Sequence, residues 1–299
     1  MSRRASIEHA PAAVAASDNH HMAETALALV VRGTDWSETS RITTLFTREF
    51  GKVRALAKGG RRLNSKFEIA FDLLTVCRVV YLRKAHGGLD LLIEAQVAER
   101  FPHLRTDLHA LNVGYYVAEL LADGTQDYDP HSELFDAAIG VLRGLGSSPR
   151  PTGAVTGGVG GGGPPQQTTA PVGRGEDRDP VSTFELVWLK QLGYSPRLDA
   201  CAVCARGLPV PPPSSVRVVF SPEAGGVVCP NCSPGVRDRR PLSDPAWAAL
   251  SALSAGADDR DPPPIIPPAI RREVRAVLGQ TVSFVLGRRP RMLAYLDGG

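Results

Sequence analysis

The chain has 299 residues, enough for two or three domains, and a formal net charge of only +3. No apolar run reaches the roughly 18–20 uncharged residues that a membrane-spanning helix needs, and the N-terminus is a poor secretory signal. These features argue against membrane and secreted proteins, so we expect an intracellular protein whose thiols stay reduced.

Patterned sequence begins near Met22. Residues 1–23 are rich in alanine without apolar periodicity, which predicts a disordered leader and makes Met22 a candidate natural start. Residues 24–100 then contain five short runs rich in Val, Leu, Ile and Thr, separated by turns that contain glycine. Five strands in about 75 residues predict a small barrel of the OB type. The expected strands are 26–33, 41–48, 52–59, 71–84 and 89–99.

Basic residues gather on two of these strands and on the turn "AKGGRRLNSKFE" that follows them. Between Arg48 and Lys66, Glu49 is the only acidic residue, so the run favours an anionic partner, with a solvated basic face as the alternative. The local aromatic residues that could stack on bases are Trp36, Phe46, Phe50 and Phe67, although Phe46 fits the core of its strand better. The seven cations are Arg48, Lys52, Arg54, Lys58, Arg61, Arg62 and Lys66.

Helical periodicity follows the barrel. Apolar residues spaced three and four apart predict helices over 107–124, 132–146, 181–194 and 269–287. Gly, Pro, Thr and Gln dominate residues 147–180, which predicts a disordered insertion; its glycine run lacks the Gly-Lys-Ser/Thr ending of a phosphate loop. The fold class is therefore α+β and multidomain. Its helical domain comprises 101–146, 181–199 and a C-terminal part 237–299, with a cysteine segment, 200–236, inserted.

Four cysteines form two C-x-x-C pairs, Cys201 with Cys204 and Cys229 with Cys232, separated by 24 residues. Four thiolates match the tetrahedral preference of Zn²⁺ and leave no position for water, which favours one structural zinc ion over a catalytic one. Disulfides fit poorly without a secretory signal, and a thioredoxin-like site needs only one such pair. The fifth cysteine, Cys77, lies in a strand pattern and is expected in the core.

Signatures of common enzymes are missing from the sequence. It has no G-x-S-x-G, no H-E-x-x-H and no G-x-G-x-x-G after a strand. We therefore predict no catalytic residues and a protein that is not an enzyme.

Three long stretches resemble the RecO family of bacterial recombination mediators. They are "VVRGTDWSETSRITTLFTREFGKVRALAKGGRR", then "FELVWLKQLGYSPRLDACAVC" with "FSPEAGGVVCPNC", and finally "VLGRRPRMLAYL". The resemblance implies a cytoplasmic, nucleoid-associated protein that binds single- and double-stranded DNA and anneals complementary strands. It further implies the partner RecR, with which it helps RecA displace single-strand-binding protein (SSB). The leader and the 147–180 insertion depart from the family pattern without replacing a motif.

In this light the seven cations predict a track for a phosphate backbone with little base preference. Two other classes of protein share parts of this pattern. A zinc-containing DNA-repair glycosylase would need a proline directly after the initiator methionine, but Ser2 follows Met1 and Ala23 follows Met22. A zinc-ribbon module that acts on protein partners remains compatible with DNA binding by the barrel. If neither the barrel nor its basic turn binds DNA, Arg271, Arg272, Arg288, Arg289 and Arg291 of the helical domain are the next candidates.

Overall fold

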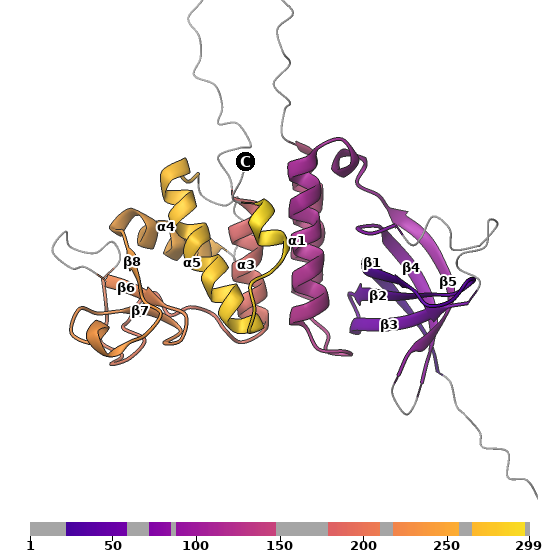
Figure 1. The fold of residues 1–299 in the computed structure, drawn as a ribbon, viewed down its shortest axis with the longest axis horizontal. Helices are drawn as coiled ribbons and strands as arrows, with labels where there is room; N and C mark the ends of the chain where they lie inside the picture. Colours follow the sequence, from indigo (N-terminus) through magenta and orange to yellow (C-terminus); the bar gives the residue numbers. More distant parts are fainter. Residues whose placement is uncertain are drawn as a thin grey trace, which may run out of the picture.

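Figure 1 shows a five-stranded barrel at one end of the molecule, helices in the middle and a small sheet at the other end. The computed structural model describes residues 22–58, 72–84, 88–147, 179–209, 218–256 and 265–296. Among these residues, no helix is long and apolar enough to cross a membrane.

The barrel is built from the first five strands, in the order β1-β2-β3-β5-β4. β1 pairs antiparallel with both β2 and β4, which closes the sheet, and β3 and β5 form the one parallel contact among these pairings. The prediction of five strands is confirmed, and their arrangement is OB-like. The strands are β1 (Met22–Asp35), β2 (Arg41–Thr47), β3 (Gly51–Ala57), β4 (Val76–Arg83) and β5 (Asp90–Glu99).

Both faces of β1 are buried in its central part, because side chains of a strand alternate between two different cores. Ala28 and Val30 belong to the cluster inside the barrel, together with apolar residues from the other strands. Leu29 and Val31 belong instead to the large cluster formed with the helices. Cys77 lies in the interior cluster, 1% exposed, as predicted. The barrel thus has its own core and also contributes one outer face to the core of the helical domain.

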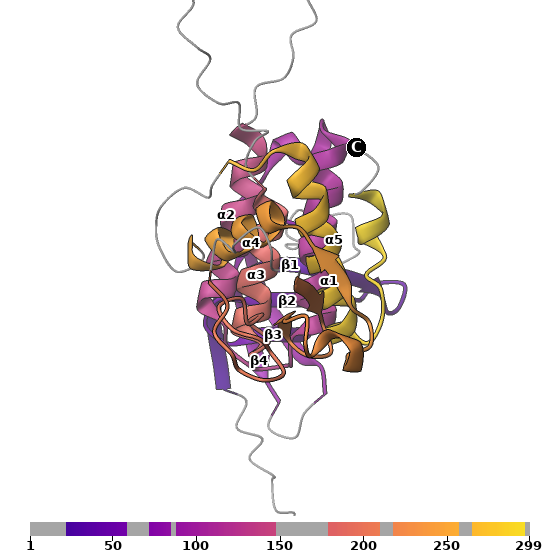
Figure 2. The same cartoon turned by 90° about the vertical axis from the view of Figure 1, so that its left-hand side faces the viewer.

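Among the described residues, five α-helices lie between the barrel and the small sheet, and Figure 2 shows α2, α3 and α4 from the side of that sheet. Asp107 caps the first helix by accepting a hydrogen bond from the backbone N–H of Ala110 (3.1 Å), and the buried Asp179 does the same for Ser182 (3.3 Å). All four predicted helices are confirmed, whereas α4 was not predicted. The helices are α1 (Leu108–Gly124), α2 (Ser132–Gly144), α3 (Pro180–Gln191), α4 (Asp244–Gly256) and α5 (Pro268–Leu286).

The small sheet has the order β7-β6-β8 and was also not predicted. Its strands are β6 (Val218–Ser221), β7 (Gly226–Val228) and β8 (Arg240–Leu242). Phe220 of β6 is 1% exposed and joins the helical core. The indole N–H of the buried Trp247 in α4 donates to the carbonyl of Leu198 (2.9 Å), which anchors the chain that leads into the cysteine segment.

Several predicted boundaries require correction. Met22 and Ala23 were assigned to the leader but lie in β1, and Pro180, assigned to the insertion, begins α3. Of the strand expected over 71–84, residues 72–75 precede β4 and include Leu74 at φ 63°. The small sheet extends past the expected end of the cysteine segment at residue 236, because β8 pairs with β6. The rest of the leader and insertion, except residues 147 and 179, lies outside the described residues.

Candidate nucleic-acid interface and metal centre

Three of the predicted phosphate-binding cations lie where the barrel meets the helices, a contact that we call the seam. Arg48 follows β2 and forms two parallel hydrogen bonds with Asp136 of α2, from Nε and Nη2, each 2.9 Å long. The hydrogen bond with Asp136 raises the pKa of Arg48 above its usual value. The guanidinium group of Arg48 is therefore already paired with a carboxylate of the helical domain.

Lys52 is the most enclosed of these cations, with a side chain that is 11% exposed. Lys52 lies in β3 between Gly51 and Val53, which are both buried. Because successive side chains of a strand point to opposite faces, the Lys52 side chain points away from the barrel core. Its ammonium group donates to the carbonyl oxygens of Ala122 (3.0 Å) and Thr125 (2.5 Å), and it lies 3.5 Å from Asp127. These carbonyls belong to the end of α1 and to the residue that follows it, where helical N–H partners are missing. Lys52 therefore caps α1 from the barrel.

The seam is also held by a close backbone approach at Gly51. This residue has φ +68°, and a Cβ placed there would lie 1.9 Å from the carbonyl oxygen of Asp129. Only glycine tolerates both the left-handed backbone and the lack of space. Tyr128 lies in the same loop as Asp129, and its hydroxyl group hydrogen-bonds to the buried Asp90. The guanidinium carbon of Arg83 lies 3.8 Å from the centre of the Tyr128 ring. The loop between α1 and α2 is thus docked on the end of the barrel.

The other predicted cations are more open. Arg54 is 52% exposed and shares Asp127 with Lys52, at 3.0 Å. Lys58, at the start of the basic turn, is exposed and is the last described residue before the gap that follows. Arg61, Arg62 and Lys66 lie outside the described residues.

The aromatic candidates separate into buried and exposed residues. Phe46 is fully buried and stacks on Phe135 of α2, with ring centroids 6.5 Å apart, so it belongs to the core as expected. Phe50 packs edge-on against Tyr81 at 6.3 Å. Trp36 lies in the loop between β1 and β2 with 64% of its surface exposed. Trp36 is therefore the described candidate with a face open for stacking, and Phe67 is outside the described residues.

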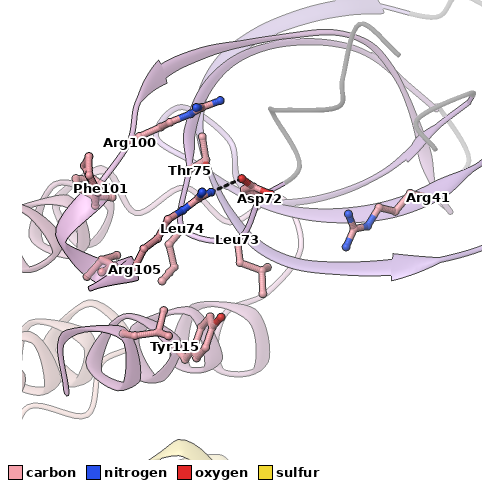
Figure 3. Close-up of a pocket in the computed structure, with 12 residues that line it drawn as sticks. Arg41, Asp72, Leu73, Leu74, Thr75, Arg100, Phe101, Arg105 and Tyr115 are labelled. Atoms are coloured by element: carbon pink, nitrogen blue, oxygen red, sulfur yellow. Dashed lines mark hydrogen bonds and ion pairs between the residues drawn. The ribbon is translucent and has the colours of Figure 1, made fainter. Parts of the chain in front are cut away.

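A hollow of about 660 Å³ opens between the barrel and α1, and we call it the junction hollow. Figure 3 shows Arg100 and Arg105 near one side of it and Arg41 on a strand farther away, with Leu73 and Tyr115 between barrel and helix. Arg105 pairs with Asp72 at 2.6 Å, whereas Arg100 is exposed. These arginines were not predicted as a site, because Arg41 lies far from Arg100 and Arg105 along the chain and none of the three belongs to a basic run.

The four cysteines of the two predicted pairs come together, with all their sulfur atoms within 4.8 Å of one another. Cys201 and Cys229 are buried, Cys204 is exposed, and its Sγ lies 3.9 Å from that of Cys229. Four sulfurs bound tetrahedrally at about 2.3 Å would lie about 3.8 Å apart, so this spacing fits a metal ion. The predicted set of ligands is thus assembled by segments on both sides of β6 and β7.

The surroundings of Cys201 favour a thiolate. Burial acts to raise its pKa, but backbone N–H groups of Cys229, Cys204 and Val203 outweigh it and lower the pKa to about 6. One of these bonds, from the N–H of Cys229, is 3.4 Å long. Hydrogen bonds among the thiols, first that with Cys229, raise the pKa of Cys232 to about 12. Cysteines bind metal ions as thiolates, and the surroundings of Cys201 already favour that form.

Two family models match the chain. "Recombination protein O N terminal" covers residues 22–101, and "Recombination protein O C terminal" covers residues 105–155 and 174–294. The first match coincides with the barrel, and the second covers the helices and the cysteine segment.

Individual relatives agree with these matches. The chain is 34% identical over 295 residues to the DNA repair protein RecO of Rhodopirellula baltica. This match covers 90% of the present chain and 97% of the Rhodopirellula protein. The chain is 33% identical over 274 residues to the protein of the same name from Anaeromyxobacter sp. (strain K), with 90% and 94% covered. The corresponding Roseiflexus protein is 28% identical over 270 residues, with 90% and 83% covered. The chain therefore belongs to the recombination protein O (RecO) family.

Proposed function

We propose that this protein is a recombination mediator in DNA repair that binds DNA without catalytic turnover. It binds single- and double-stranded DNA through an N-terminal OB-fold barrel and anneals complementary strands. Together with RecR, it helps load RecA onto single strands covered by SSB. The observation that carries this proposal is the similarity, over 90% of the chain, to proteins named DNA repair protein RecO.

Within this function, the cations of the basic turn bind most of the phosphate backbone. These cations are Lys58, Arg61, Arg62 and Lys66. Lys58 is exposed, whereas Arg48, Lys52 and Arg54 have carboxylates of the helical domain within reach. A cation that is already paired gains less from a phosphate, because the existing ion pair has to be given up. The exposed Trp36 provides a stacking surface close to β2. We assign Arg48, Lys52 and Arg54 an auxiliary part in this track.

The four cysteines, Cys201, Cys204, Cys229 and Cys232, hold one structural Zn²⁺. Four thiolate donors suit zinc, and a closed shell leaves no coordination position for a reaction. Zinc analysis of protein purified without chelators should give one ion per chain, and Cys229→Ser should remove it and loosen the small sheet while the barrel stays folded. Protein without stoichiometric zinc would contradict this assignment.

A direct test of the function uses labelled single strands of two unrelated sequences and their complements. We expect the purified protein to bind both strands with similar affinity, because backbone contacts carry no sequence information, and to accelerate annealing. Reversal of Arg61, Arg62 and Lys66 to glutamate should weaken both activities. Failure of the parent protein to bind either strand at low salt would refute the proposed function.

A further inference from the structure

A second basic hollow, of about 580 Å³, lies along α5, and we call it the arginine hollow. Its walls come from α5, from β8 and from the C-terminal segment that returns over α5. In Figure 1 these elements lie on the side of α1 that faces away from the barrel. None of the described residues that line the hollow is acidic. The polar residues that line it are Arg240, Arg272, Arg275, Gln280, Ser283 and Arg289.

One of these arginines is fixed within the fold. Arg275 forms three hydrogen bonds, 2.9–3.2 Å long, with the fully buried Asp179 at the start of α3. This pair offsets the charge of Arg275 and holds its guanidinium group at the base of the hollow. Removal of one partner from such a buried pair would destabilise the fold, so Arg275 is a poor choice for a functional test.

The remaining arginines are open to solvent. Arg240, Arg272 and Arg289 are all exposed, and Arg272 stands one helical turn from Arg275 on the same face of α5. Gln280 accepts a hydrogen bond from Nε of Arg240 (3.3 Å) and so helps to orient that side chain toward the hollow. The exposed guanidinium groups of Arg240 and Arg272 carry like charges at one hollow, and an anion between them would offset their repulsion.

The nearby carboxylate on α5 is already engaged elsewhere. Glu273 accepts hydrogen bonds from the backbone N–H (2.7 Å) and the hydroxyl group (2.6 Å) of Ser243, next to the start of α4. It therefore holds α4 and α5 together and does not line the arginine hollow. Glu273 therefore does not offset the charges of Arg240 and Arg272 at the hollow. Guanidinium groups bind phosphate through two parallel hydrogen bonds, which makes phosphate the anion best matched to this set.

We propose that the arginine hollow binds the phosphodiester backbone of a second nucleic-acid strand while the barrel holds the first. This inference rests on the proposed function, since annealing requires one protein, or two in contact, to hold two strands. Its location beyond α1 separates the hollow from the strands of the barrel, so that the barrel and the hollow can each hold their own strand of DNA. A free phosphate or a nucleotide has the same anionic groups, and the test has to distinguish those sources from a strand.

The test compares Arg272→Glu with Lys190→Glu in the full-length protein. Both residues are exposed and both changes alter the charge equally, but Lys190 lies on α3 and does not line the hollow. The number of short labelled oligonucleotides bound per chain is measured at saturation, together with the rate of annealing. We expect Arg272→Glu to bind one oligonucleotide where the parent binds two, and to anneal about tenfold more slowly, since phosphate contacts dominate affinity. Lys190→Glu should behave like the parent, and Arg272→Lys should recover part of the loss.

Two outcomes would overturn the inference. If Arg272→Glu anneals and binds two oligonucleotides as Lys190→Glu does, the hollow holds no strand. If inorganic phosphate or a nucleoside triphosphate stabilises the parent but not Arg272→Glu, while oligonucleotide binding is unchanged, the ligand is a free anion. Arg240→Glu gives the same comparison should Arg272→Glu fail to fold. Absence of DNA binding by the parent would instead refute the proposed function, so the two failures are distinguishable.

Discussion

The cations of the seam and those of the arginine hollow differ in the groups of the protein that lie next to them. At the seam, Arg48 meets Asp136, while Lys52 and Arg54 share Asp127. Around the arginine hollow, Arg240 and Arg272 are exposed, and no described lining residue is acidic. Similar side chains therefore serve two purposes, docking of domains in one place and binding of anions in the other. The comparison predicts that changes at the seam alter stability first, and changes at exposed cations alter DNA binding first.

The largest effect on stability is expected for Lys52→Met. The substitution keeps the apolar stem but leaves two carbonyl oxygens and Asp127 without their buried donor, which should lower the free energy of unfolding by about 2–4 kcal/mol. Urea unfolding measures this change. The matched control is Arg54→Met, which loses a half-exposed contact with the same aspartate and should cost less than about 1 kcal/mol. Equal stability of the two variants would contradict the docking role of Lys52.

A smaller effect should appear as a pH dependence at a second contact across the seam. Arg143 of α2 donates two hydrogen bonds to Glu99 of β5 (2.8 and 2.6 Å), and they lower the pKa of that carboxyl group. Because the folded pKa is depressed, the contribution is present above the unfolded value of about 4.3 and is lost as the pH falls through the folded value.

Unfolding of Arg143→Gln should therefore show a deficit against the parent, below about 1 kcal/mol at pH 7, that shrinks toward pH 3. The Arg143 side chain is 62% exposed, so solvent screens the ion pair and its contribution to the free energy of unfolding is small. Urea unfolding at several pH values measures it. A deficit that stays constant, or grows, as the pH falls would exclude the Glu99 carboxylate as its cause.

The smallest effect is expected for the insertion. Replacement of residues 150–178 by a Gly-Ser linker of about eight residues removes Gly, Pro, Thr and Gln, which bury little apolar surface. The length of a flexible loop contributes weakly to stability, so the change should stay within about 1 kcal/mol and leave DNA affinity unaltered. Thermal unfolding and anisotropy with labelled DNA measure the two quantities. A marked fall in the melting temperature would mean that this segment contributes to the fold.

The barrel strands and the cysteine site could be predicted from sequence because their signals are local. Strand periodicity and glycine turns identify β1 to β5, and two C-x-x-C pairs identify the four cysteines that the fold brings together. The strands β6, β7 and β8 have only three or four residues each, too few for a period to emerge. The buried face of α4 carries Ala246, Trp247, Leu250 and Leu253, but prolines on both sides obscured its helical pattern.

The pairing of the seam could not be predicted, because its partners are distant in sequence. Counting charges near Arg48 identifies only Glu49 as an opposing group, whereas Asp136 lies 88 residues further along the chain. Asp127 is 73 residues from Arg54. A basic run therefore predicts that anions will be bound, but not whether they belong to a ligand or to the protein itself.

The most direct test of the account is the salt dependence of single-strand DNA binding by three proteins: the parent, Lys52→Met, and the variant with Arg61, Arg62 and Lys66 changed to glutamate. On single strands the logarithm of affinity falls with the logarithm of salt concentration by about 0.7 per phosphate contact. We predict a steep slope for the parent, a slope reduced by at most about 0.7 for Lys52→Met, because Lys52 makes at most one auxiliary contact, and weaker binding with a much flatter slope for the triple variant. A triple variant that binds as the parent does at every salt concentration would contradict the assignment of DNA binding to the basic turn.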